Sequence, residues 1–227
     1  MCGRYSFNIT RQRFEQVYEI QAPLEFAPRY NIAPTQQATI IRQTESDAQA
    51  SMARWGYQQP GKSLLINARA ETVGELPTFA QSFRQRRCIV PATGWYEWQA
   101  SSTGKHPHHL YRTDQEPLAF AGIWTPSSNG DQFAIITQAA DAAIREIHDR
   151  QPVILNRERW RVWLADTPLA ELEAELKAIL EETPVPLEAY PVGLRVSSVR
   201  HDDASLLERI EIDRGLFGFL DGNRDGL

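Results

Sequence analysis

The chain has 227 residues, of which 42% are apolar, and carries a formal net charge of −5. This length and apolar content suffice for one substantial core, and we expect a single large domain. No apolar run reaches the roughly 20 residues that span a bilayer, and no secretion signal opens the chain, so we expect a soluble, cytoplasmic protein without a membrane partner. The two cysteines, Cys2 and Cys88, are too few for a disulfide framework and fit no zinc pattern.

The charge is unevenly distributed. Residues 1–100 hold 11 Lys and Arg against 8 Asp and Glu, whereas the remainder is acidic. The overall sign argues against a nucleic-acid partner, but arginine forks suit phosphate oxygens, so the first part could supply a basic face. The alternative is an ordinary solvated surface. The arginines concerned are Arg4, Arg11, Arg13, Arg29, Arg54, Arg69, Arg84, Arg86 and Arg87.

Cys2 directly follows the initiator methionine. Removal of Met1 would leave an α-amine and a thiol on one residue, with reference pKa values of about 7.7 to 8.0 and about 8.5. An aldehyde can form an imine with this amine and then be trapped by the sulfur as a five-membered thiazolidine. The alternative is that Cys2 only buries a small side chain or frays with the terminus.

Short β-type runs dominate the rest of the sequence and are separated by turn-forming residues. Many short strands with few long helices predict a largely antiparallel, curved or barrel-like sheet with peripheral helices, an α+β fold. The predicted strands are Ala38–Arg42, Ser51–Trp55, Leu64–Ala68, Cys88–Val90, Trp95–Gln99, His109–Tyr111, Leu118–Trp124 and Phe133–Thr137. We expect Cys88 to be a buried core residue.

Helices are predicted at the margins of this sheet. Thr10 is placed to cap a helix that runs to about Tyr18. A short helix over Ala139–Ile147 would deliver His148 at its end. Further helices are predicted over Arg157–Leu164, from Thr167-Pro168 onward and over Asp202–Ile210, and residues 219–227 are expected to form a disordered tail.

Three of these segments carry polar groups that a plain β core does not need. On a strand, Asn67, Arg69 and Glu71 would project from one face and could orient a substrate; the alternative is an Arg69–Glu71 ion pair with Asn67 as a cap. Glu97 lies among aromatic residues, whose desolvation raises a carboxyl pKa toward the range useful for proton transfer. His148 sits at a helix-to-strand junction between charged residues.

Two further features give weaker indications of function. Strand alternation puts Glu97 on the face opposite Trp98, so Trp98 need not touch a substrate that Glu97 touches. His106, His108 and His109 form a short tract, but no acidic or cysteine ligands stand at a recognisable spacing, so we expect no metal and no cofactor.

Six segments, taken together and in order, resemble the SOS-response-associated peptidase (SRAP) family, the abasic-site processing proteins. They are Met1-Cys2-Gly3-Arg4-Tyr5, Arg29-Tyr30-Asn31-Ile32-Ala33-Pro34, Arg54-Trp55-Gly56, Asn67-Ala68-Arg69-Ala70-Glu71-Thr72, Gly94-Trp95-Tyr96-Glu97-Trp98 and Ile147-His148-Asp149-Arg150-Gln151-Pro152. The resemblance implies one β-rich SRAP domain over residues 1–218. It also implies a monomer that binds single-stranded DNA at damaged or replicating DNA in the nucleoid and becomes covalently attached to abasic sites.

The resemblance also assigns residues. It makes Cys2 the nucleophile and places Asn67, Glu97 and His148 in the active site. Arg4 and Arg69 match phosphate-binding arginines, and Trp55, Asn31, Pro34 and Trp98 fall to the DNA-binding surface. The segment 57–62 is shorter and less aromatic than the family pattern.

Other functions stay open at this point. Weak DNA lyase activity could accompany crosslinking, because an imine also permits β-elimination. Cys2, His148 and Asn67 could instead imitate the nucleophile, base and orienting residue of a cysteine peptidase that acts on its own N-terminus. A third interpretation is a non-catalytic single-stranded DNA binder that uses arginine and tryptophan.

Overall fold

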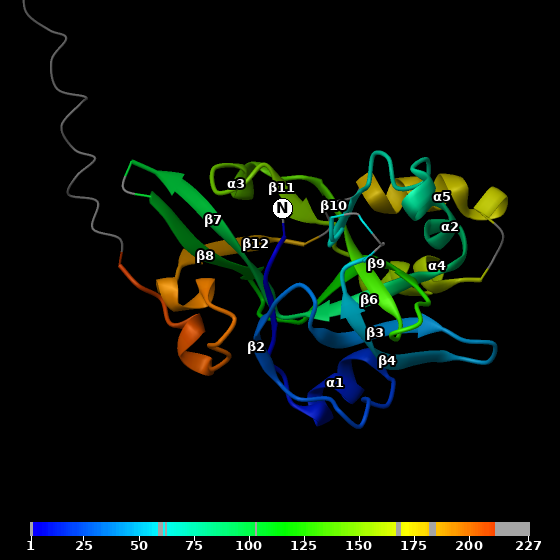
Figure 1. Cartoon of the computed structure of the whole chain (residues 1–227), viewed down its shortest axis with the longest axis horizontal. Coiled ribbons are helices and arrows are strands. Elements are labelled where there is room, and N and C mark those ends of the chain that lie inside the picture. The colour runs from blue at the N-terminus through cyan, green and yellow to red at the C-terminus, as the bar shows by residue number, and fades with distance from the viewer. Residues whose placement is uncertain are drawn as a thin grey trace, which may run out of the picture.

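A computed structural model gives the fold of the chain. It describes residues 2–58, 61, 63–102, 104–166, 169–181 and 185–211, without the side chains of 169–173 and 181. The predicted tail over 219–227, the end of the proposed domain at 218 and the Thr167-Pro168 helix start lie outside the described residues. Two sheets form the body of the protein, and the N-terminus lies between them (Figure 1).

The first sheet has five strands in the order β12-β8-β7-β1-β2, all antiparallel. Its central strand β7 pairs on one side with β8 over seven residues and on the other with the short β1. The β7–β8 hairpin extends to the left in Figure 1. The strands are β1 (Tyr5–Phe7), β2 (Arg29–Ile32), β7 (Gly94–Ser101), β8 (Gly104–Arg112) and β12 (Leu187–Pro191).

The second sheet closes on itself as a ring, because β10 pairs with β9 as well as with β4. It is antiparallel except where β10 runs parallel to β4 and β5. β11 and β5 both pair with β10. The strands are β3 (Gln37–Gln43), β4 (Ala48–Trp55), β5 (Asn67–Arg69), β6 (Arg87–Ala92), β9 (Leu118–Thr125), β10 (Gln132–Ala139) and β11 (Arg150–Pro152).

Helices cover the outside of this ring (Figure 1). Helix α1 begins after Thr10, whose side chain accepts from the Arg13 N–H at 3.1 Å, as the sequence predicted. It buries Phe14 and Tyr18. The helices are α1 (Arg11–Tyr18), α2 (Pro77–Gln85), α3 (Ala142–Arg145), α4 (Trp160–Leu164) and α5 (Leu169–Glu181), with 3₁₀ turns η1 (Arg157–Arg159), η2 (Leu194–Ser197) and η3 (Ala204–Leu207).

The α+β prediction is confirmed, and several element boundaries differ from the sequence prediction. β5 begins at Asn67, because Leu64–Ile66 form only one bridge, between Leu65 and Tyr57. The helix expected over Ala139–Ile147 is reduced to α3, since Ala139 still belongs to β10. The helix expected over Asp202–Ile210 is the single 3₁₀ turn η3. None of the described helices is long and apolar enough to cross a membrane.

Candidate active site

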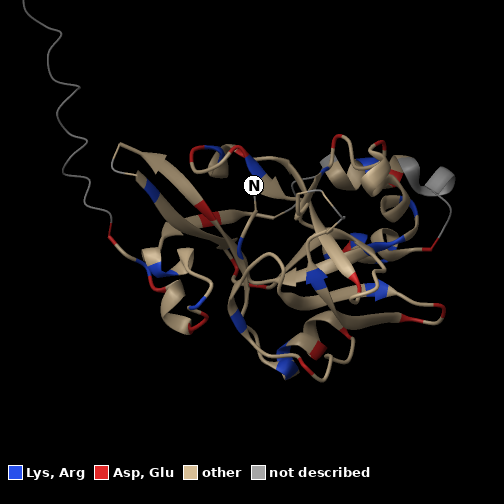
Figure 2. Ribbon diagram, viewed as in Figure 1, with Lys and Arg blue, Asp and Glu red and all other residues tan. Residues whose placement is uncertain are grey.

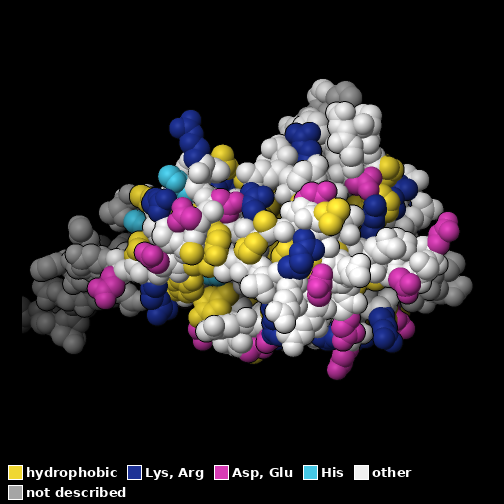
Figure 3. Space-filling model, turned by 90° about the horizontal axis from the view of Figure 1, so that it is seen from below, with side chains coloured by type: hydrophobic (Ala, Val, Ile, Leu, Met, Phe, Trp, Pro, Cys, Tyr) yellow, Lys and Arg dark blue, Asp and Glu magenta, His cyan; other side chains and the backbone are white. Residues whose placement is uncertain are grey.

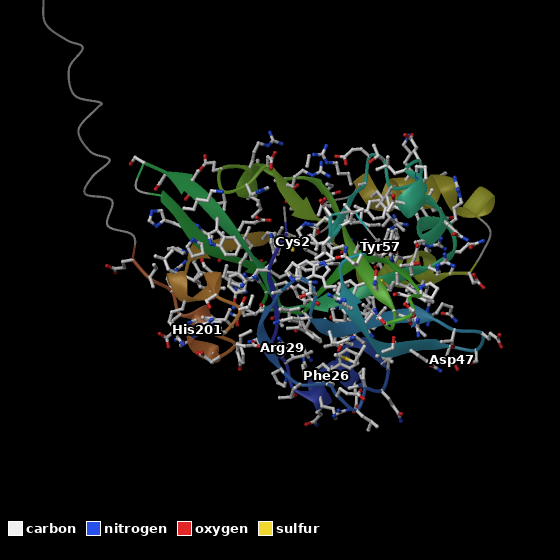
Figure 4. The ribbon with its side chains drawn as sticks, in the orientation of Figure 1. Cys2, Phe26, Arg29, Asp47, Tyr57 and His201 are labelled. Carbon is white, nitrogen blue, oxygen red and sulfur yellow. The ribbon has the colours of Figure 1, made fainter. Side chains whose placement is uncertain are left out.

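Strand β1 carries Cys2 into the interior of the protein. β1 is held on both sides, by β7 and by β2, and the Cys2 that precedes it lies in the middle of the molecule (Figure 4). Cys2 is 0% exposed. Its thiol lies 4.0 Å from the Arg4 carbonyl oxygen. Burial raises the pKa of the Cys2 thiol, and the nearby Glu97 raises it further, so the sulfur is held as a neutral thiol.

Asn67 fixes the backbone of Cys2. Its amide Nδ2 donates to the Cys2 carbonyl oxygen at 2.8 Å. Asn67 opens β5, which is paired with β10 in parallel, so its place is set by the ring-shaped sheet. Its Oδ1 is buried and accepts no hydrogen bond from the residues that the structure describes. This oxygen could therefore accept a hydrogen bond from a donor on a bound molecule.

Glu97 is a buried carboxyl in the middle of β7. It is 2% exposed, and burial raises its pKa to about 7, although the positively charged chain terminus acts in the opposite direction. At neutral pH the carboxyl is therefore divided between its acid and carboxylate forms, as a group that both gives and takes protons requires.

His148 approaches Glu97 from the loop that follows α3. Its Nε2 lies 3.8 Å from Glu97 Oε2. At Nδ1 the ring meets two neighbours, the Arg150 backbone N–H at 3.0 Å and the Asp149 carboxylate at 3.0 Å. The N–H favours the neutral ring with its proton on Nε2, and the carboxylate favours the imidazolium. Burial lowers the pKa of His148.

An ion pair that the sequence analysis missed joins two segments of the site. Arg150 makes two hydrogen bonds to Glu71, at 2.5 and 2.9 Å, and a third to the Thr137 carbonyl oxygen. The Arg69–Glu71 ion pair weighed from the sequence is thus replaced by one with Arg150. The Arg150–Glu71 ion pair holds the segment after Asn67 against the segment after His148. From the sequence, Arg150 could be recognised only as an arginine within a polar motif, and nothing there indicated Glu71 as its partner.

Arg4 and Asn31 contact each other. Arg4 donates to Asn31 Oδ1 at 2.9 Å and to the Val196 carbonyl oxygen at 2.8 Å, and burial lowers its pKa. The Asn31 amide donates to three carbonyl oxygens, those of Val196, Ser198 and His201. Both side chains therefore hold the 194–201 segment against β1 and β2, and Asn31 is fully buried.

The other aromatic and proline candidates for DNA contact differ in accessibility. Trp55 is 0% exposed, stacks on Phe133 and donates to the Ile66 carbonyl oxygen, so its indole is part of the core. Trp98 is half-buried and donates to Ser197 Oγ at 3.1 Å, on the face of β7 opposite Glu97 as alternation predicted. Pro34 is half-buried beside the β2 end.

Most arginines of the expected basic face are used within the protein. Arg13 pairs with Glu116, Arg29 pairs with Asp202, and Arg87 is buried against backbone carbonyls. Arg69 differs, because it is exposed and its guanidinium has no hydrogen-bond or ion-pair partner among the described residues. Charges of both signs alternate over the ribbon in Figure 2, and Figure 3 shows the same mixture around hydrophobic side chains on the lower face.

The histidine tract is divided between two faces of β8. His109 contacts the ring of Tyr96 on one face, and alternation puts His106 and His108 on the other. Within the described residues, no three His, Cys, Asp or Glu side chains are arranged to hold a metal ion.

The chain matches the family model for SOS response associated peptidase (SRAP) over residues 1–199. The protein belongs to this family. It is 31% identical to the abasic site processing protein YedK of Escherichia coli, over 92% of this chain and 100% of that protein. It is 32% identical to the abasic site processing protein YoqW of Bacillus subtilis, over 92% of this chain and 99% of that protein. To the abasic site processing protein HMCES of Xenopus tropicalis it is 28% identical, over 62% of this chain and 54% of that protein.

Solved structures support the fold. A protein from Bacteroides thetaiotaomicron superposes with a TM-score of 0.78 at 22% identity, covering 92% of this chain and all of that one. A phage-related protein from Bordetella bronchiseptica superposes with a TM-score of 0.70 at 31% identity, covering 84% of this chain and 94% of that one.

Proposed function

We propose that this protein processes abasic sites in single-stranded DNA by covalent capture. After Met1 is removed, the α-amine and thiol of Cys2 form a thiazolidine with the sugar aldehyde. The observation that carries this proposal is that Asn67 and Glu97, from separate strands, act on Cys2, while His148 lies beside Glu97. The names of the relatives support the abasic site as substrate.

The reaction needs a neutral amine and a proton donor at the same place. Near neutral pH an α-amine is appreciably deprotonated, since its reference pKa is about 7.7 to 8.0. The amine attacks the aldehyde carbon, and the carbinolamine hydroxyl leaves as water with a proton from Glu97, whose pKa of about 7 suits this step. The Cys2 thiol then adds to the imine carbon and closes the ring, and its proton returns to the Glu97 carboxylate.

His148 and Asn67 support this chemistry from either side. His148 assists opening of the sugar ring as a proton donor. Its Nε2, on the side of Glu97, carries a proton both in the neutral ring that the Arg150 N–H favours and in the imidazolium that Asp149 favours. Asn67 holds the Cys2 carbonyl, and its buried Oδ1 can accept from the carbinolamine hydroxyl. The exposed Arg69 is free to contact the DNA backbone. Weak lyase activity follows if part of the imine undergoes β-elimination before the thiol closes the ring.

A cysteine peptidase is less well supported by the geometry. Such an enzyme lowers the pKa of its thiol with a neighbouring histidine, so that the thiolate attacks. Here burial raises the pKa of the Cys2 thiol, and the ionisable group that shifts it most, the Glu97 carboxyl, raises it further. A non-catalytic DNA binder would not need a carboxyl with a raised pKa beside a buried cysteine.

One experiment separates these functions. The purified protein, with Met1 removal checked by intact mass, is incubated with single-stranded DNA that carries one abasic site, and denaturing gels are scored for a covalent band. We expect a band that Cys2→Ala abolishes. Cys88→Ala is the matched control, because Cys88 is equally buried but lies in β6 and carries no α-amine. Absence of the band with the unmutated protein would contradict the proposal.

A further inference from the structure

His108 lies on the same face of the sheet as Glu97. The two residues are register partners across β7 and β8, which places their Cβ atoms about 5 Å apart. The neighbouring pair Tyr96 and His109 confirms the alternation, since these rings meet on the opposite face with centroids 5.1 Å apart. His108 is therefore the cross-strand neighbour of the proposed proton carrier.

The hydrogen bond at His108 defines its tautomer. Its Nδ1 lies 3.1 Å from the His106 carbonyl oxygen, which only accepts, so Nδ1 carries a proton. Burial lowers the pKa of His108, which keeps the ring neutral and leaves a lone pair on Nε2. Within the described part of the chain, this nitrogen has no hydrogen-bond partner. His108 is 8% exposed, compared with 2% for Glu97, and so lies closer to solvent.

The usual order of the pKa values of a carboxyl and an imidazolium is reversed between Glu97 and His108. In water a carboxyl loses its proton well before an imidazolium does, but here burial raises the pKa of Glu97 to about 7 and lowers that of His108. The other ionisable groups that face the pair are Cys2 on the β1 side, His148 and Asp149 from the loop after α3, His106 on β8 and the chain terminus. Pro191, the β12 partner of His108, brings no charge.

The proposed reaction leaves a proton to be removed whenever the Cys2 amine enters it as an ammonium ion, whose extra proton Glu97 takes up to give the neutral amine. An α-ammonium, a thiol and an aldehyde give a thiazolidine, one water and one proton: the carbonyl oxygen leaves with one hydrogen from nitrogen and one from sulfur, and the third ammonium proton departs. Cys2 and Glu97 are both buried, so this proton has to pass through another group.

We propose that His108 is the proton-exchange partner of Glu97. It accepts at Nε2 the proton that Glu97 has taken up and releases it to solvent beside the β7–β8 hairpin, which restores the carboxylate. This inference rests on the proposed crosslinking function. It assigns His108 a role through Glu97 and not a contact with the DNA.

Kinetics of the full-length protein test the role. The rate of adduct formation with abasic single-stranded DNA is measured in single turnover at low buffer concentration, across pH 6 to 9, for the unmutated protein, His108→Gln and His108→Ala. We expect the substitutions to slow the reaction about tenfold, below the cost of losing a general acid-base group itself. Added imidazole should restore the rate of His108→Ala and leave the unmutated protein unchanged. An unchanged rate and pH profile for His108→Gln would overturn the proposal.

Two controls separate a structural effect from proton exchange. His201→Gln removes a histidine from the η2–η3 segment, which packs on the Trp98 face of β7, opposite Glu97, and should react like the unmutated protein. Thermal melts of each variant show whether the fold is kept. A loss of rate in His108→Ala that imidazole does not restore would also overturn the proposal.

Nitrogen NMR of the His108 ring tests the pair without DNA. We expect the Nδ1–H tautomer near neutral pH and a step in the ring shifts as Glu97 titrates, which Glu97→Gln removes. An Nε2–H tautomer, or a ring that does not sense Glu97, would overturn this inference even if adducts form. If the unmutated protein forms no adduct, the crosslinking function fails, and the NMR result alone decides whether the two groups share a proton.

Discussion

Asn67 donates an amide hydrogen bond to the carbonyl oxygen of Cys2 at 2.8 Å, across 65 positions of sequence. Asn67→Ala removes the hydrogen bond that fixes Cys2. We expect the free energy of unfolding to fall by about 1 kcal/mol. Adduct formation should slow by about 10- to 100-fold, because a small displacement of a reacting group is costly.

Chemical denaturation and single-turnover gels measure the two effects of Asn67→Ala. Gln81→Ala on α2 is the matched control, since it truncates an exposed amide. Equal adduct rates for Asn67→Ala and the unmutated protein would exclude a positioning role for Asn67.

Glu97 makes the stability of the protein depend on pH. Its folded-state pKa of about 7 lies above the ordinary value of 4.5, so the stability associated with its neutral form is complete below pH 4.5 and is lost as the pH rises through 7. Glu97→Gln keeps a neutral side chain at every pH. The variant should therefore gain stability relative to the unmutated protein between these values, reaching on the order of 3 kcal/mol above pH 7.

Denaturant unfolding at pH 5 and pH 8 measures this difference. Glu75→Gln, which changes an exposed carboxylate, should alter the free energy of unfolding little at either pH. A Glu97→Gln effect of equal size at both pH values would show that the carboxyl is not titrating in this range.

Arg69 is exposed and unpaired among the described residues, so its charge is available to a DNA phosphate. We expect Arg69→Ala to weaken binding of single-stranded DNA and to reduce by about one the number of ions released, read from the salt dependence of affinity. Stability should change by less than about 0.5 kcal/mol. Fluorescence anisotropy titrations at several salt concentrations measure this, with Arg161→Ala on α4 as the control. An unchanged salt slope would remove Arg69 from the DNA contacts.

Gly94 lets β7 approach β8 closely. A Cβ there would lie 2.3 Å from His109 Nε2 and 2.5 Å from the Leu110 carbonyl oxygen. Gly94→Ala should therefore destabilise the protein by about 3 kcal/mol, the upper range for overpacking a core. The same strand carries Glu97, so adduct formation should fall too. Gly74→Ala meets nothing closer than 3.5 Å and should melt like the unmutated protein. Similar melting temperatures for both variants would contradict this account.

Much of the sheet was predictable because its longer strands alternate and end at turn residues. Predictions failed where the local signal was weak. β1, β11 and β5 have three residues each, too few for a period to be read. Helix α2 was missed because it follows Leu76, which offers no capping side chain.

The candidate site was only partly accessible from sequence. Glu97 was singled out by its aromatic neighbours, and its raised pKa is borne out by burial. The bond between Glu71 and Arg150 joins residues 79 positions apart, and no local pattern reports such a pair. The sequence does not distinguish a buried Trp55 from a surface Trp55, and only its stacking on Phe133 in the structure places it in the core.

Strand β10 connects the ring-shaped sheet to the site. It pairs with β9 and β4 in the ring, with β5, which begins at Asn67, and with β11, which begins at Arg150. Opening β10 would therefore release the ring and the groups around Cys2 in the same event. We therefore expect the reactive centre and the scaffold to open as one cooperative unit, with the amide hydrogens of β5, β10 and β11 exchanging at a common opening free energy.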